Sequence, residues 1–132
     1  MKPLKIIVCS ALAFGLTGMS QVALAEMRDL TKNEITETFS GKTVWSNHAN
    51  KNRSSKTYYA PDGTLKNKRS KDIGTREGKW YVDDKNLLCK EYDGDTKCRR
   101  VVDKSGKLKM YKGKKHVGNY KKFKDGNCLE KC

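Results

Sequence analysis

The chain has 132 residues and a formal net charge of +14, and charged residues make up 33% of it. Its mean hydropathy is −0.85. A chain of this length forms one domain, and so polar a composition leaves a small core that needs covalent help to be stable. Beyond the N-terminal segment no apolar stretch approaches the roughly 20 residues of a membrane-spanning helix, which excludes a polytopic membrane protein.

The N-terminal segment has the three parts of a secretory leader. Lys2 and Lys5 give it a positive start, and residues 6–18 form an apolar run that is too short to span a membrane. Residues 23–25, Ala-Leu-Ala, supply the small side chains that a signal peptidase recognises, so we expect cleavage before Glu26. A leader this short is typical of bacterial exported proteins, and it predicts a periplasmic or secreted protein. The predicted parts are a signal peptide at 1–25 and a single antiparallel β domain at 26–132.

The mature domain is expected to open with one short helix. Thr31 and Glu34 have the spacing of a capping box at the helix start. Ile35 and Phe39 lie one turn apart and share a face, and Gly41 is placed to end the helix. We expect this apolar face to pack over one end or face of a sheet.

From residue 42 onward the pattern is that of β-strands. Short runs of aromatic and β-branched residues alternate with turn residues at nearly regular spacing. Connections this short force neighbouring strands to be antiparallel. We therefore expect a mainly all-β fold, an antiparallel meander that forms a small open or closed barrel. The expected strands are 42–48, 55–60, 64–69, 76–82, 86–92, 95–103, 107–111 and 115–123.

Four cysteines remain in the mature chain, an even number that indicates a disulfide framework in an exported protein. Asp93-Gly94 is a preferred pair for a two-residue hairpin turn. With this turn, Cys89 faces Cys98 at a non-hydrogen-bonded pair, where Cα atoms lie about 4.5 Å apart. That separation is within the range of a disulfide, so we expect Cys89 and Cys98 to be bonded.

The other two cysteines, Cys128 and Cys132, are then left to each other and would hold the C-terminal tail. Their three-residue gap requires a turn between them. A four-cysteine zinc site is the alternative, but the chain has no Cys-x₂-Cys knuckle, and an oxidising compartment disfavours free thiolates. We expect no metal ion and no cofactor.

Several short motifs follow the helix in order: GKTVW at 41–45, YYAPDGT at 58–64, GKW at 78–80, Leu88-Cys89 and Cys98. This order resembles small bacterial exported proteins of the lipocalin-like or calycin-like kind, including families of unknown function. The resemblance covers most of residues 38–103 and implies a β-barrel fold, but it brings no activity with it. The mature chain is also shorter than a full lipocalin, which argues against a large apolar ligand cavity.

Four aromatic residues would be the candidates for a ligand pocket inside such a barrel. Large aromatic side chains are also what a polar domain needs to build a core. We therefore expect these four residues to pack in the core rather than to line a pocket. They are Trp45, Tyr58, Tyr59 and Trp80.

Lysine dominates the positive charge and is densest at 112–124, KGKKHVGNYKKFK. Lysines interleaved with exposed aromatic rings can follow a polyanion, although solvated strand edges are also rich in lysine. We predict an anionic-partner surface here, for lipopolysaccharide, anionic lipid, a glycosaminoglycan or an acidic protein. Its residues are Lys112, Lys114, Lys115, Tyr120, Lys121, Lys122, Phe123 and Lys124.

Catalysis has little support in the sequence. Small secreted ribonucleases need two acid–base groups, and the mature chain has two histidines, His48 and His116. No residue is placed to orient either ring, and no nucleophile, zinc-protease or phosphate-loop motif occurs. We expect no catalytic residues and no enzyme.

The leading hypothesis is thus an exported, non-enzymatic binding or accessory protein that engages an anionic partner through a lysine-rich face. A charge this far from neutral promotes association with anions whether or not a partner is selected. The alternatives are a lipocalin-like small-ligand carrier, an inhibitor or immunity-type module, and a small secreted ribonuclease.

Overall fold

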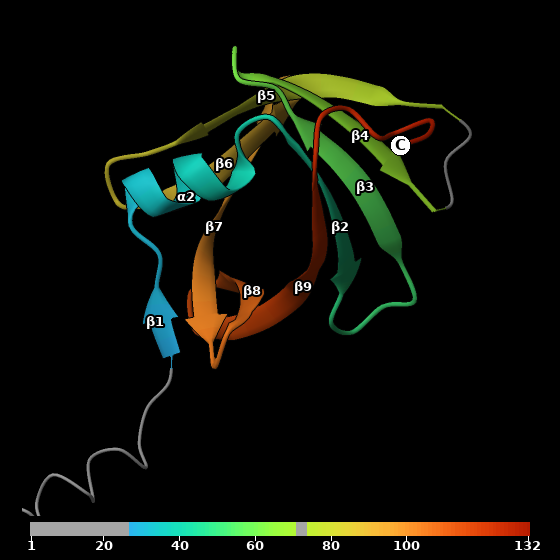
Figure 1. The fold of residues 1–132 in the computed structure, drawn as a ribbon. Coiled ribbons are helices and arrows are strands. Elements are labelled where there is room, and N and C mark those ends of the chain that lie inside the picture. Colours follow the sequence, from blue (N-terminus) through green and yellow to red (C-terminus); the bar gives the residue numbers. More distant parts are fainter. Residues whose placement is uncertain (1–26, 71–73) are drawn as a thin grey trace, which may run out of the picture.

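The computed structural model describes residues 27–70 and 74–132, so the predicted signal peptide lies outside the described residues. The described chain is one meander of short antiparallel strands preceded by a helix (Figure 1). In chain order its elements are β1 (Met27–Asp29), α2 (Lys32–Phe39), β2 (Lys42–His48), β3 (Ser54–Tyr59), β4 (Thr64–Arg69), β5 (Arg76–Val82), β6 (Leu87–Tyr92), β7 (Asp95–Lys104), β8 (Lys107–Lys112) and β9 (Lys115–Asp125).

The strands β2 to β9 form a closed barrel. Each strand pairs antiparallel with the next one in the chain, and β9 returns to pair with β2. The short β1 continues the edge of β7 beyond the end of β6, with Asp29 opposite Val102. The prediction of a mainly all-β antiparallel barrel with one short helix is confirmed. The sequence left an open and a closed barrel as alternatives, and the barrel is closed.

The hairpin of β6 and β7 has the predicted register. Asp93 and Gly94 have φ values of 50° and 82°, as a type I′ turn requires. Cys89 therefore lies opposite Cys98, with their Cα atoms 4.0 Å apart, and the two residues form a disulfide. Cys128 and Cys132 are also bonded, so both predicted pairings are confirmed.

Helix α2 closes one end of the barrel, which we call the helix end. Thr31 and Glu34 form the predicted capping box at its start. The backbone N–H of Lys32 donates to the side chain of Asn86, in the turn between β5 and β6. Ile35 and Phe39 are completely buried. At this end the helix thus fills the barrel with apolar side chains.

The core gathers around the ring of Phe39. The rings of Tyr59, Tyr120 and Phe123 meet it edge to face, at centroid distances of 5.1, 5.1 and 5.3 Å. Each such pair adds about 0.5–1.5 kcal/mol beyond its buried area. These rings come from α2, β3 and β9, so they tie together elements far apart in the sequence.

The C-terminal tail packs on the outer side of the barrel, beside β3 and β4 in Figure 1. Thr43 on β2 is the main anchor, because its hydroxyl donates to the carbonyl of Gly126 and accepts from the N–H of Cys128. Leu129 is 4% exposed, and Lys56 donates to the Cys128 carbonyl. The second disulfide therefore closes a loop that is already attached to the sheet.

Gly78 on β5 makes room for the ring of Tyr92 on β6. A Cβ atom at Gly78 would collide with the carbonyl oxygen of Glu91 and would lie 2.8 Å from Cδ1 of Tyr92. Backbone cannot move away cheaply, so only glycine allows this approach. The position of the Tyr92 ring therefore depends on the missing side chain at Gly78.

We expect Gly78→Ala to lower the free energy of unfolding by about 2–3 kcal/mol, because the added methyl group overpacks the β5–β6 pair. Urea unfolding followed by circular dichroism measures the change. Gly74→Ala is the matched control, since a Cβ atom there meets nothing within 4 Å. Equal stability of the two variants would contradict the proposed contact.

Removing the Cys89–Cys98 bond by a double change to serine should lower the free energy of unfolding by about 2–3 kcal/mol, because the unfolded chain gains loop entropy. Urea denaturation without reductant tests this. Mass mapping under non-reducing conditions should recover one peptide pair joined through Cys89 and Cys98. A Cys89 peptide joined to Cys128 or Cys132 would refute the hairpin register.

Candidate functional site: the cationic end of the barrel

The six predicted surface lysines are all exposed, but the two aromatic residues among them are not part of that surface. Tyr120 is 7% exposed and lies in the core, and Phe123 packs against the core. A bulge in β9 explains the error, because Lys122 pairs with Trp45 while Tyr120 pairs with Ser46, leaving Lys121 as the extra residue. An extra residue lets two rings three positions apart face the same side. The exposed members are Lys112, Lys114, Lys115, Lys121, Lys122 and Lys124.

The four candidate pocket aromatics divide between the two faces of the barrel wall. Trp80 and Tyr59 are buried in the core, as expected. Trp45 lies outside the core cluster, on the β2 surface, with Lys122 and Lys56 at 4.8 and 5.8 Å from its ring. Tyr58 precedes the buried Tyr59 and so faces outward as well. The expectation that all four are core residues is wrong for Trp45 and Tyr58.

Opposite the helix end, at what we call the far end, the interior changes from apolar to cationic. Strand alternation aims Leu88 into the core, and it must therefore aim Lys90 and Tyr92 to the same side. Arg99 lies opposite Leu88 on β7. Arg76, at the start of β5, places its guanidinium over the Tyr92 ring at 4.0 Å from the centroid.

We call Arg76, Lys90 and Arg99 the cationic cluster. Within the described chain none of the three forms a salt bridge, because the ion pairs there involve other residues. Among the described residues, the side chain of Arg99 donates to the carbonyl of its neighbour Cys98. Within that part of the chain the cluster is therefore positive charge without an acidic partner.

The pKa of Lys90 shows how unfavourable this environment is for a cation. Burial, followed by the charges of Arg99, Arg76 and Lys97, lowers the pKa of Lys90 from 10.5 to about 8. His48 at the end of β2 also has a lowered pKa, mainly through burial and then through the charges of Lys51, Arg53, Arg99 and Lys90. Positive potential therefore extends across the far end from β2 to β7.

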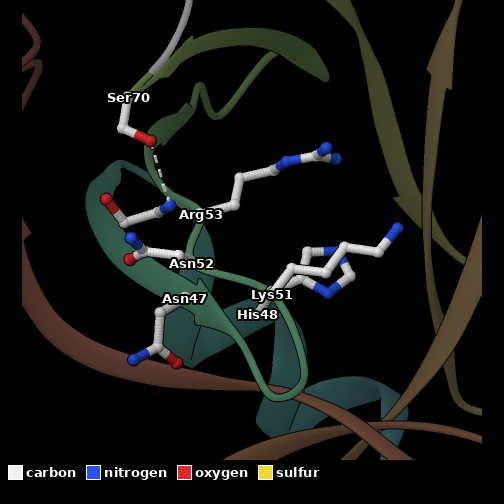
Figure 2. A pocket seen from close by; sticks show the side chains of 7 residues that line it. Asn47, His48, Lys51, Asn52, Arg53 and Ser70 are labelled. Atoms are coloured by element: carbon white, nitrogen blue, oxygen red, sulfur yellow. Dashed lines mark hydrogen bonds between the residues drawn. The ribbon is translucent and has the colours of Figure 1, made fainter.

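A hollow of about 440 Å³ lies beside the β2–β3 loop at this end. Figure 2 shows the side chains of His48, Lys51 and Arg53 extending from the loop to one side. Loop and barrel thus present cations together, an arrangement suited to attracting anions. The residues that line the hollow are Asn47, His48, Lys51, Asn52, Arg53, Ser54 and Ser70.

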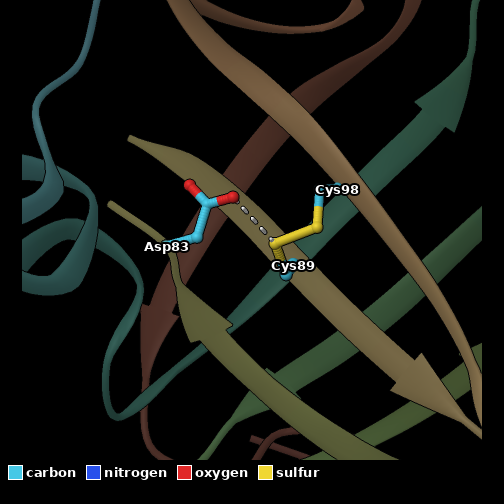
Figure 3. Close-up of side chains that lie close together, drawn as sticks. All are labelled: Asp83, Cys89 and Cys98. Carbon is cyan, nitrogen blue, oxygen red and sulfur yellow. Dashed lines mark hydrogen bonds between the residues drawn. A yellow bond between two sulfur atoms is a disulfide. The ribbon is translucent and has the colours of Figure 1, made fainter. Parts of the chain in front are cut away.

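In the described chain, one group of potential metal ligands lies close together. It consists of Asp83, Cys89 and Cys98, whose ligand atoms are within 4.8 Å of one another (Figure 3). The two sulfurs are bonded to each other, so neither is a thiolate. One carboxylate oxygen of Asp83 accepts from the N–H groups of Lys85 and Leu87 at 2.9 Å. Asp83 thus shapes the β5–β6 turn, and the group does not offer the donors of a metal site.

The two histidines occupy different surroundings. His48 lies at the far end among cations, whereas Nε2 of His116 is 2.9 Å from Oδ1 of Asn119 and its ring lies against Tyr111. In the described part of the chain, neither ring contacts a carboxylate that would orient it as an acid–base catalyst. The ribonuclease alternative therefore gains no support from their geometry.

Sequence reasoning missed the cationic cluster, although one signal was present. In the segment Leu-Leu-Cys-Lys-Glu-Tyr at 87–92, a residue two positions after a buried leucine lies on the same face of the strand. Counting from Leu88 places Lys90 inside. No such orientation was expected for Lys90 from the sequence, and an inward lysine goes against the general rule that lysine is rarely buried without a partner.

Replacing Lys90 by methionine should stabilise the protein by about 1–3 kcal/mol at pH 7, because it removes a cation repelled by Arg99, Arg76 and Lys97. The native state binds fewer protons than the unfolded chain above pH 8, so the wild-type free energy of unfolding should rise from pH 8 to about 10. The Lys90→Met variant should lack most of this rise. Urea unfolding at a series of pH values tests both effects, with the exposed Lys107→Met as control; equal pH slopes would contradict the assignment.

Comparison with protein-family models, curated proteins and solved structures finds no match to this chain. The resemblance to lipocalin-like proteins therefore stays a prediction that rests on its short motifs. A closed β-barrel is also shared by proteins of unrelated activity. The function has to be inferred from the residues of the cationic end.

Proposed function

We propose that this protein is an exported, non-enzymatic binding protein that takes an anionic ligand at the far end of its barrel. The observation that supports this most directly is the cationic cluster, which has no acidic partner in the described part of the chain. Unpaired charge brought out of water lowers stability. A bound anion offsets that penalty and gives the arrangement a role.

The proposal joins two of the predicted alternatives, the anionic partner and the small ligand held by a barrel. The exposed lysines of residues 112–124 raise the local concentration of anions but bind them weakly and with a strong dependence on salt. Inside the barrel the cations are partly removed from water, where charge–charge interactions are stronger. Selective binding is therefore better served by the interior cluster than by the outer lysines.

Export is supported by the covalent chemistry. Two disulfides indicate an oxidising compartment, because cytosolic thiols are kept reduced. Across residues 27–70 and 74–132, the structure contains no helix with the length and apolarity needed to cross a membrane. Together with the leader predicted at 1–25, the disulfides favour a protein that acts in the periplasm or outside the cell.

Isothermal titration calorimetry with inorganic pyrophosphate, at fixed ionic strength and pH 7, tests the proposal. We expect saturable binding by the wild type and affinity at least about tenfold lower in Lys90→Met, since charge-assisted hydrogen bonds contribute about 1.5–3 kcal/mol. Lys107→Met should bind as the wild type does, because Lys107 is exposed at the start of β8, near Thr38 of α2 and so at the helix end.

Two results would contradict the proposal. If wild type and Lys90→Met bind pyrophosphate with equal affinity, the ligand does not bind at the cationic cluster inside the barrel. Loss of binding after simultaneous Lys112→Ala, Lys114→Ala and Lys115→Ala changes, with Lys90→Met unaffected, would instead assign anion binding to the outer lysines.

A further inference from the structure

Two polar atoms next to the cationic cluster are buried and have no hydrogen-bond partner among the described residues. They are Nε of Arg76 and the hydroxyl oxygen of Tyr92. The guanidinium carbon of Arg76 lies 4.0 Å from the centroid of the Tyr92 ring, so the two side chains are in contact. A guanidinium held over a ring still has N–H groups at its edge that can donate to a ligand.

Buried donors without partners are rare in native proteins, because each loses its bonds to water on folding. Here both groups can donate, one as an N–H and the other as an O–H. They come from the neighbouring strands β5 and β6, and the same two strands carry Arg76 and Lys90 of the cluster. Donors and positive charge therefore occur together at one place.

We propose that this place is an oxyanion subsite, in which one ligand oxygen accepts from Nε of Arg76 and from the Tyr92 hydroxyl while Lys90 and Arg99 neutralise the ligand's charge. The inference rests on the proposed function and narrows its ligand to the phosphate and sulfate class. Tetrahedral oxyanions carry several acceptor oxygens and up to two negative charges. Chloride has no directional acceptor, and acetate has one charge and two oxygens, so both satisfy fewer of these groups.

The local packing supports a prepared subsite. Gly78 lets the Tyr92 ring lie against β5, where any larger residue would displace it. Burial raises the pKa of Tyr92, and the charge and side-chain interaction of Arg76 together with the charge of Arg69 oppose this rise without cancelling it. The hydroxyl therefore keeps its proton at neutral pH and can donate. A group held in place before binding costs less entropy to engage.

The experiment compares inorganic phosphate, sulfate, acetate and chloride as probes, by calorimetry at pH 7 and constant ionic strength. We expect phosphate and sulfate to bind the wild type more tightly than acetate or chloride. Tyr92→Phe removes the hydroxyl and keeps the ring, and it should weaken phosphate binding by about tenfold or more. Arg76→Lys keeps the charge but removes Nε, and it should also weaken phosphate binding while changing acetate binding less.

Tyr81→Phe is the matched control, because Tyr81 lies on the same strand as Arg76 and is 47% exposed. It should bind phosphate as the wild type does. Thermal unfolding of each variant confirms that it is folded, and the anion preference of the wild type gives a measurement that needs no variant at all.

The outcomes separate this inference from the broader proposal. Phosphate binding that depends on Lys90 but is unchanged in Tyr92→Phe and Arg76→Lys would overturn the oxyanion subsite and leave an anion-binding protein. Equal affinity for phosphate and chloride would also overturn the oxyanion subsite. Buried water would then be the partner of Nε of Arg76 and of the Tyr92 hydroxyl. If none of the four anions binds, and pyrophosphate does not bind either, both proposals are wrong.

Discussion

Closure of a small barrel from a polar sequence is the constraint on which the other features depend. A closed sheet has no free edges, but every second side chain must then point inward. This chain has too few apolar residues to fill the inside from end to end. The available ones, with Phe39 at their centre, gather under α2. The far end of the same strands is left with arginine, lysine and tyrosine.

This division explains why stability and proposed function oppose each other in one molecule. The helix end is held by aromatic contacts and by the polar contacts of α2 with the β5–β6 turn. The far end brings like charges together and so works against folding. Proteins commonly tolerate such strain where a ligand relieves it. The helix end thus holds the fold together, and the far end carries the residues of the proposed ligand site.

Much of the fold could be read from the sequence because its signals are local. The capping box of Thr31 and Glu34 and the Asp93-Gly94 turn each specify structure within a few residues, and the turn also fixes which cysteines meet. The β9 bulge at Lys121 could not be read in this way. It is set by how β9 meets β2, far away in the chain, and it decides that Tyr120 and Phe123 face inward together.

The candidate site was harder to predict than the fold for a related reason. An inward lysine looks the same in sequence as an outward one until the strand register is known. Arg76 and Tyr92 are also sixteen positions apart in the chain, and only the pairing of β5 with β6 makes them neighbours. Composition correctly indicated an excess of positive charge, but it carried no information about which of those charges the barrel encloses.

The Cys89–Cys98 bond has a consequence for when the β6–β7 hairpin takes its final register. Lys90, Tyr92 and Arg99 all belong to the hairpin that this bond locks. A slip of one residue in that hairpin would turn the slipped strand's side chains to the other face. Oxidation of the two thiols therefore fixes the register that aims the site inward. A newly made chain that is still reduced lacks this lock, so the inward orientation of Lys90, Tyr92 and Arg99 is secured only once the two thiols have been oxidised.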